Sequence, residues 1–119
     1  MFVYRWRMTI PADSPSVSQS VVVVPTLQVG PLVSAVGDPL RWAIVRELSS
    51  GEPRMVNEIA QALRKPPSLI SKHLVWLRKA GAVVTGRGRL YSIPPQFVPS
   101  PGDGVVDYGH LVMRTKLAV

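Results

Sequence analysis

The sequence predicts an α+β fold in which three to four helices precede a β-hairpin. Three observations support this. Residues 56–63 carry apolar side chains at helical spacing, residues 68–80 form a second amphipathic helix with a cationic outer face, and residues 82–93 contain two β-prone runs around a Gly-x-Gly tip. Two helices joined by a tight turn and followed by a basic hairpin are typical of a winged helix-turn-helix, which holds one helix against a nucleic-acid groove.

The first helix of this pair has the features of a supporting helix. Ala60 is small at the point where two crossing helices must approach closely. Arg64 and Lys65 bring positive charge to the turn. Pro66 and Pro67 end this helix and suit the first positions of a new one. The core stripe of the supporting helix is expected to be Val56, Ile59, Ala60 and Leu63.

The second helix has three faces when its residues are placed at helical spacing. The core stripe is Ile70, Leu74 and Leu77, the adjoining core-facing stripe is Leu69, His73, Trp76 and Ala80, and the outer face is Ser68, Ser71, Lys72, Val75, Arg78 and Lys79. Gly81 is expected to stop the helix in the left-handed cap conformation. Alone, the outer face is as readily an ordinary solvated surface, but the supporting helix before it favours a nucleic-acid contact.

The hairpin that follows is predicted to be the wing. Two β-prone runs flank Thr85–Arg89. The tip carries Arg87 and Arg89 and no acidic residue, which suits contact with phosphates or entry into the minor groove. The alternative is a hairpin tip that serves solubility alone.

Two helices are expected before the helix-turn-helix. A short one starts at Gly30, and the next has Asp38 as its N-cap and Pro39 in its first turn. Arg41 and Arg46 are expected to point outward, and no functional site is assigned to this helix. Its buried stripe is expected to be Leu40, Ile44, Val45 and Leu48.

Three motifs follow one another along these helices. They are Gly37-Asp38-Pro39-Leu40-Arg41-x-Ala43-Ile44-Val45-x-x-Leu48, then Glu58-Ile59-Ala60-x-x-Leu63, then Ser71-x-His73-Leu74-x-x-Leu77-Arg78-x-Ala80-Gly81-x-Val83. In this order and spacing, and with the wing after them, they resemble the ArsR-type winged-helix transcriptional regulators. The resemblance covers residues 32–93, about half of the chain.

The resemblance implies a homodimeric repressor that binds a pseudo-palindromic operator in double-stranded DNA. Many members of this family release DNA when a metal or metalloid binds. The thiol-based sensors carry two cysteines just before the second motif, where this chain has Met55 and Asn57, and the chain contains no cysteine. A thiolate arsenic, cadmium or lead site of that kind is therefore excluded.

A second metal site of the family takes Asp, His and Glu ligands from a C-terminal helix. Asp107 and His110 are a faint counterpart, but no further carboxylate follows Asp107, and His73 is distant in sequence. We therefore expect no metal and no other cofactor. His73 matches a histidine common in the second helix of this family, which implies packing or DNA contact.

The charge of the chain favours a polyanionic partner. Fourteen Lys and Arg against seven Asp and Glu give a formal net charge of +7, and the isoelectric point is near 10.6. Ten basic and four acidic residues fall between Leu27 and Phe97, so the bias lies in the central domain. The pattern contains no long basic amphipathic helix, so nucleic acid is favoured over a membrane surface.

The expected compartment is the cytoplasm. The absence of cysteine fits a cytosolic protein. No segment has the ~20 apolar residues that cross a bilayer, and the N-terminus lacks the pattern of a signal peptide.

The chain is expected to divide into an N-terminal part, residues 1–26, and a central winged helix-turn-helix domain, residues 27–97. Residues 1–26 combine strand-like alternation at Phe2–Ile10, a linker rich in Pro and Ser, and a short apolar run at Val21–Val24.

The C-terminal extension, residues 98–119, is predicted to contain a strand from Val105 onward. Gly109 and the many valines favour strand over helix. The family has a long dimerisation helix near this position, so a strand implies a different dimer contact. Terminal strands would pair between subunits or fold back within one chain.

The function predicted from these observations is sequence-specific DNA binding by a dimeric transcriptional regulator, with a small-molecule effector unidentified. The alternative is a winged-helix module for protein contact. An enzyme is disfavoured because no nucleophile–base pair, carboxylate pair or phosphate-binding glycine loop is present. The predicted DNA-binding residues are Pro67, Ser68, Ser71, Lys72, His73, Arg87 and Arg89.

Overall fold

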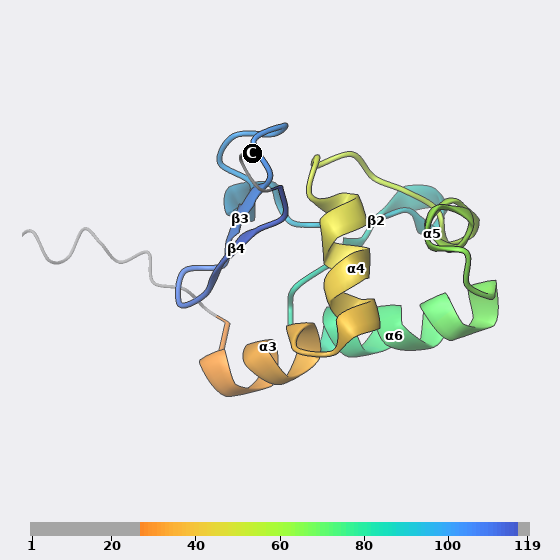
Figure 1. The fold of residues 1–119 in the computed structure, drawn as a ribbon, viewed down its shortest axis with the longest axis horizontal. Coiled ribbons are helices and arrows are strands. Elements are labelled where there is room, and N and C mark those ends of the chain that lie inside the picture. Colours follow the sequence, from red (N-terminus) through yellow and green to blue (C-terminus); the bar gives the residue numbers. More distant parts are fainter. Residues whose placement is uncertain (1–26, 117–119) are drawn as a thin grey trace, which may run out of the picture.

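Figure 1 shows the computed structural model of the protein, which describes residues 27–116. The strands and linker predicted within residues 1–26, and the end of the C-terminal extension, lie outside these residues. The described chain forms four α-helices and two antiparallel hairpins, which confirms the predicted α+β winged helix-turn-helix. The elements in chain order are α3 (Val29–Val36), α4 (Pro39–Leu48), α5 (Val56–Leu63), α6 (Pro67–Lys79), β1 (Val84–Thr85), β2 (Tyr91–Ser92), β3 (Val105–Asp107) and β4 (Val112–Arg114).

Helix α4 begins at the predicted cap. One oxygen of the Asp38 carboxylate, Oδ2, accepts hydrogen bonds from the backbone N–H groups of Leu40 at 2.9 Å and Arg41 at 3.1 Å. Pro39 is the first helical residue. The bond from the Arg41 backbone is the main reason that the pKa of Asp38 lies below its ordinary value. The bond from Leu40 and the nearby charge of Arg41 lower it further, against an opposing effect of desolvation.

A single hydrophobic core joins the described elements. The core stripes predicted for α4, α5 and α6 are buried, apart from three residues at the edge that are half-buried: Leu40, Val56 and Leu63. Ala60 is buried where α5 packs against α6. This packing fixes the angle at which α6 crosses the domain.

Two residues with left-handed backbone conformation mark the ends of the helix pair. Arg64 ends α5 with φ of 57° and ψ of 47°, a conformation that is uncommon for residues other than glycine. Gly81 follows α6 with φ of +82°, as predicted. A Cβ at Gly81 would also come too close to the end of the Leu27 side chain, which would have to shift to make room.

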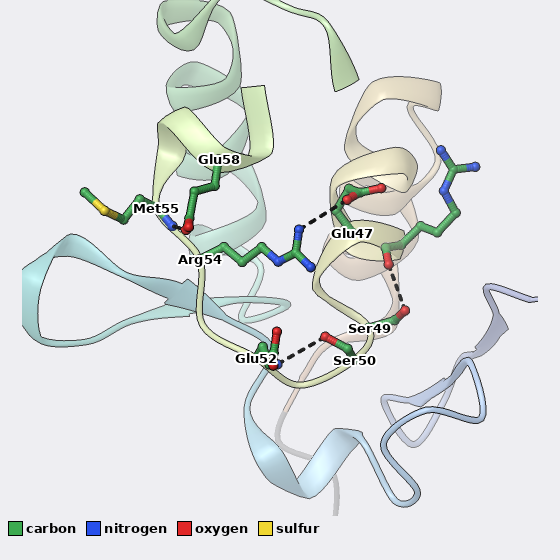
Figure 2. A network of polar contacts seen from close by, with 8 residues as sticks. Glu47, Ser49, Ser50, Glu52, Arg54, Met55 and Glu58 are labelled. Carbon is green, nitrogen blue, oxygen red and sulfur yellow. Dashed lines mark hydrogen bonds and ion pairs between the residues drawn. The ribbon is translucent and has the colours of Figure 1, made fainter. Parts of the chain in front are cut away.

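The wing is attached to the loop between α4 and α5. Strands β1 and β2 pair with Thr85 opposite Tyr91. On its other edge Tyr91 exchanges two backbone hydrogen bonds of 2.8 Å with Arg54. The Arg54 side chain forms an ion pair of 3.5 Å with Glu47, and Glu58 accepts a hydrogen bond of 2.8 Å from the Met55 backbone (Figure 2). The base of the wing is therefore held by α4 and by the start of α5.

The C-terminal extension is strand rather than helix, as predicted. In the described part it folds back within one chain, with Val106 opposite Met113 in the β3–β4 hairpin. Gly109 has φ of +98° and lies in the turn, so the single strand expected from Val105 onward is interrupted there. The buried hydroxyl of Tyr108 donates a hydrogen bond of 2.9 Å to the carbonyl of Ala82. The hairpin thus packs on the same core as the helices.

The expectation that Arg41 points outward is wrong. Its Nε donates a 2.6 Å hydrogen bond to the carbonyl of Ala35 at the end of α3, and its Nη1 lies 3.1 Å from Nδ1 of His73 on α6. Its guanidinium carbon is 5.4 Å from the centre of the Trp76 ring. Periodicity within α4 carries no information about these neighbours. Arg46 is exposed, as predicted.

Candidate nucleic-acid interface

The outer face of α6 is exposed along its first two turns. Pro67, Ser68, Ser71 and Lys72 are all exposed, and Val75 is 39 % exposed. The first turn contains no acidic residue. The positive end of the helix dipole lies at the same end, so this half of α6 favours an anionic partner.

His73 lies apart from the other predicted site residues on α6. It is half-buried against Arg41. Because arginine only donates hydrogen bonds, the Nδ1 atom of His73 must be the acceptor. Of the two roles implied for His73, this geometry supports packing. Its neighbour Trp76, predicted to face the core, is 57 % exposed, with one side covered by Arg41.

The tip of the wing is a tight turn that exposes two arginines. Arg87 and Arg89 are exposed at either end of a short 3-10 turn, and the backbone N–H of Gly86 donates to the Leu90 carbonyl at 2.8 Å. Gly88 has φ of 69° and Arg89 has φ of 60°. The conformation of Arg89 costs free energy in a residue with a side chain, and such strain is often found at functional sites.

A groove of about 410 Å³ separates α6 from the wing. Helix α6 contributes Ser71 and Arg78, and Val56 comes from the start of α5. The wing contributes the other four lining residues, Thr85, Gly86, Arg89 and Tyr91. None of these seven residues is acidic. Arg78 was not among the predicted site residues, although its spacing of seven from Ser71 places both on one face of the helix.

A smaller hollow of about 270 Å³ lies at the other end of α6. It is bordered by Arg64, Lys65 and Pro67 from the turn, together with Asn57, Ala60 and Gln61 from α5. Like the groove by the wing, it has basic residues and no acidic ones. The helix thus has a basic hollow near each of its ends, an arrangement that suits a surface crossing two phosphate backbones.

Residues 38–84 match the family model described as "Bacterial regulatory protein, arsR family". The segment from residue 38 to residue 84 belongs to the arsR family. The match runs from the N-cap of α4 to the first residue of β1 and so contains α4, α5 and α6. The preceding helix α3 and the β3–β4 hairpin lie outside it.

Two relatives are both named HTH-type transcriptional repressor SmtB, from Mycobacterium tuberculosis strains H37Rv and CDC 1551. Each is 40 % identical to this chain over 67 residues, which cover 54 % of this chain and 49 % of the relative. The chain therefore spans about half the length of the curated relatives it matches.

The match of residues 38–84 to the arsR family agrees with the prediction of a regulatory protein rather than an enzyme. Within residues 27–116, no three His, Cys, Asp or Glu side chains gather in a group that could bind a metal ion. In the faint counterpart of an arsR metal site, Asp107 ends β3 and His110 lies in the turn that follows; both are exposed, and Asp107 accepts a hydrogen bond from the backbone of Gly109. In the same described part, no helix has the length and apolar character needed to cross a membrane.

Proposed function

We propose that this protein is a sequence-specific DNA-binding transcriptional repressor that acts as a homodimer, without a cysteine metal site. The observation that carries the proposal is the exposed basic face of α6, which lies beside a wing whose tip holds Arg87 and Arg89. The arsR assignment and the repressors named SmtB support it. A regulator of this kind acts on DNA in the cytoplasm.

In this proposal α6 lies in the major groove. Pro67, Ser68, Ser71 and Lys72 face the bases and the adjoining backbone from the N-terminal half of the helix. The Lys72 ammonium reaches the acceptor atoms of guanine, and the hydroxyls of the two serines donate to phosphates or base edges. Arg87 and Arg89 contact phosphates or the neighbouring minor groove.

A homodimer would present two such helices to a pseudo-palindromic operator, with half-sites about one helical turn apart. Helix α3 offers an apolar strip for this contact, since Val29 and Val33 lie one helical turn apart and are 49 % and 48 % exposed. The variant Val33→Glu is then expected to shift the protein toward monomer in sedimentation and to weaken operator binding. If the mass of Val33→Glu in sedimentation equals that of the wild type, the dimer contact lies elsewhere.

The first test is binding of the purified protein to a labelled fragment of its own upstream DNA, with random duplex as competitor, over a series of salt concentrations. Binding that survives competition and falls steeply with salt supports the proposal. Equal loss to competitor leaves only nonspecific binding and contradicts sequence specificity. No binding at low salt would favour the alternative, a winged-helix module for protein contact.

A further inference from the structure

We infer that the groove between α6 and the wing holds one phosphate of the DNA backbone, contacted by Arg78 from the helix and Arg89 from the wing. The inference rests on the proposed DNA-binding function and identifies a contact within it. Sequence-independent contacts of this kind fix the register of a helix in the major groove.

The chemistry of the groove suits a phosphodiester. It combines two guanidinium groups with the hydroxyls of Ser71 and Thr85, and none of its lining residues is acidic. Guanidinium is planar and offers paired N–H donors, which match the two free oxygens of a phosphate. Arg78 and Arg89 are both exposed, so no folding contact consumes their charge.

The backbone of the wing supports the same conclusion. Arg89 adopts φ of 60°, a conformation that glycine would adopt at lower cost. Gly86, in contrast, has φ of −123° and ψ of −157°, which any residue can adopt. A Cβ at Gly86 would meet no atom within 4 Å. The wing therefore carries an arginine at position 89, where the backbone conformation favours glycine. At position 86 it carries glycine, although a side chain there would project into open space.

The test compares single and paired variants on a duplex of random sequence and on the upstream fragment, with anisotropy measured over a salt series. Arg78→Gln and Arg89→Gln are each expected to weaken binding to both duplexes in similar proportion. The double variant is expected to reduce the slope of log affinity against log salt by about 0.9, the value for one phosphate. If the two arginines contact separate phosphates, the slope for the double variant should fall by about 1.8 instead. That result would overturn the inference that they share one phosphate.

Lys79→Gln is the matched control, because Lys79 and Arg78 both border a hollow beside the start of α3, but only Arg78 also lines the groove by the wing. It is expected to change the slope less than Arg78→Gln. A second variant, Gly86→Val, adds bulk to the groove without removing charge. It is expected to keep the melting temperature of the wild type and to lose affinity for both duplexes.

The outcomes separate this inference from the proposed function. If the wild type prefers its upstream fragment while Arg78→Gln, Arg89→Gln and Gly86→Val all bind like Lys79→Gln, the inference is wrong and the function stands. If the wild type shows no sequence preference but the double variant loses the slope of one phosphate, the contact stands and sequence-specific function fails.

Discussion

Arg41 on α4 donates a hydrogen bond across 3.1 Å to the Nδ1 atom of His73 on α6. The same guanidinium donates to the carbonyl of Ala35 at the end of α3 and covers one side of the Trp76 ring. One side chain thus links three helices. The orientation of α6, and with it the direction of its basic face, depends on a residue that is remote from that face.

Replacement of Arg41 is expected to destabilise the fold. Arg41→Lys should lower the free energy of unfolding by about 1–2 kcal/mol, because a single ammonium cannot reproduce the fixed geometry of both hydrogen bonds. Urea denaturation measures the effect. Arg46→Lys is the control, since Arg46 also lies over a tryptophan ring, at 5.6 Å from Trp42, but is exposed. It should change stability by less than ~0.5 kcal/mol. Equal losses would contradict the bridging role of Arg41.

The cap of α4 should make stability depend on pH in the acid range. The folded pKa of Asp38 is lowered, chiefly by the bond from the Arg41 backbone. Its charge-dependent contribution is therefore complete above the unfolded pKa, ~3.9, and is lost as the pH falls through the folded pKa. Asp38→Ala should cost about 1 kcal/mol at neutral pH. Asp38→Asn retains a capping group, so it should cost less and show a weaker acid dependence. Parallel acid profiles of wild type and Asp38→Asn would contradict this account.

The Tyr108 hydroxyl should stabilise the junction between the β3–β4 hairpin and the helices. Tyr108→Phe leaves the buried carbonyl of Ala82 without this donor, at a cost of about 1–2 kcal/mol. Burial raises the pKa of Tyr108 well above its ordinary value. The resulting stabilisation is complete below the unfolded pKa, ~10, and is lost as the pH rises above it. Denaturation of Tyr108→Phe should lack this alkaline loss, and Tyr91→Phe, at a half-buried ring, serves as control.

Arg64 should lower stability while contributing to DNA affinity. Because its φ is 57°, Arg64→Gly should stabilise the fold by up to ~1 kcal/mol and also weaken binding to DNA. Thermal unfolding and anisotropy measure the two effects. Lys65→Gly is the neighbouring control, and it should weaken DNA binding without any gain in stability. No gain for Arg64→Gly would show that glycine does not relieve strain at Arg64, and an equal gain for Lys65→Gly would show that the gain does not come from the backbone conformation of Arg64.

Lys72 should determine sequence preference rather than overall affinity. Lys72→Ala is expected to reduce discrimination between the upstream fragment and random duplex by about 1–3 kcal/mol. Arg87→Ala should instead weaken binding to both and lower the salt dependence. The measurement is competition binding for each variant. Wild-type affinity and salt slope in both would contradict the assignment of these two residues.

The sequence was sufficient to predict α4, α5 and α6, because each buries one stripe of side chains at helical spacing, and turn residues such as Asp38 and Gly81 mark where helices begin and end. It did not predict what depends on neighbouring elements. The partial burial of Arg41 depends on its contacts with the end of α3 and with α6, and Trp76 is exposed apart from the side that Arg41 covers. The turn at Gly109 divides a segment whose alternation reads as one strand.

The candidate site was likewise predictable only where a single element determines it. The exposed side chains of α6 and the wing tip were predicted from one face and one hairpin, whereas the groove that joins them is formed only when both are folded. Arg78 belongs to that groove, and its position on the same face as Ser71 was the signal available in the sequence. The spacing of His73 had already placed it on the core-facing side of the helix, and its half-buried position agrees with that spacing rather than with a DNA contact.

The pairing of Tyr91 with both Thr85 and Arg54 divides the wing into two parts with different opening free energies. The amides of Arg54 and Tyr91 are bonded to each other across an element that the core holds, so their hydrogen exchange should require opening of the domain. The tip has one short backbone bond, from Gly86 to the Leu90 carbonyl, and a longer one of 3.4 Å from Leu90 to the Arg87 carbonyl, and its arginines are exposed, so its amides should exchange through local fraying. The base of the wing would then keep its conformation on contact with DNA, while the tip adjusts its conformation to the DNA.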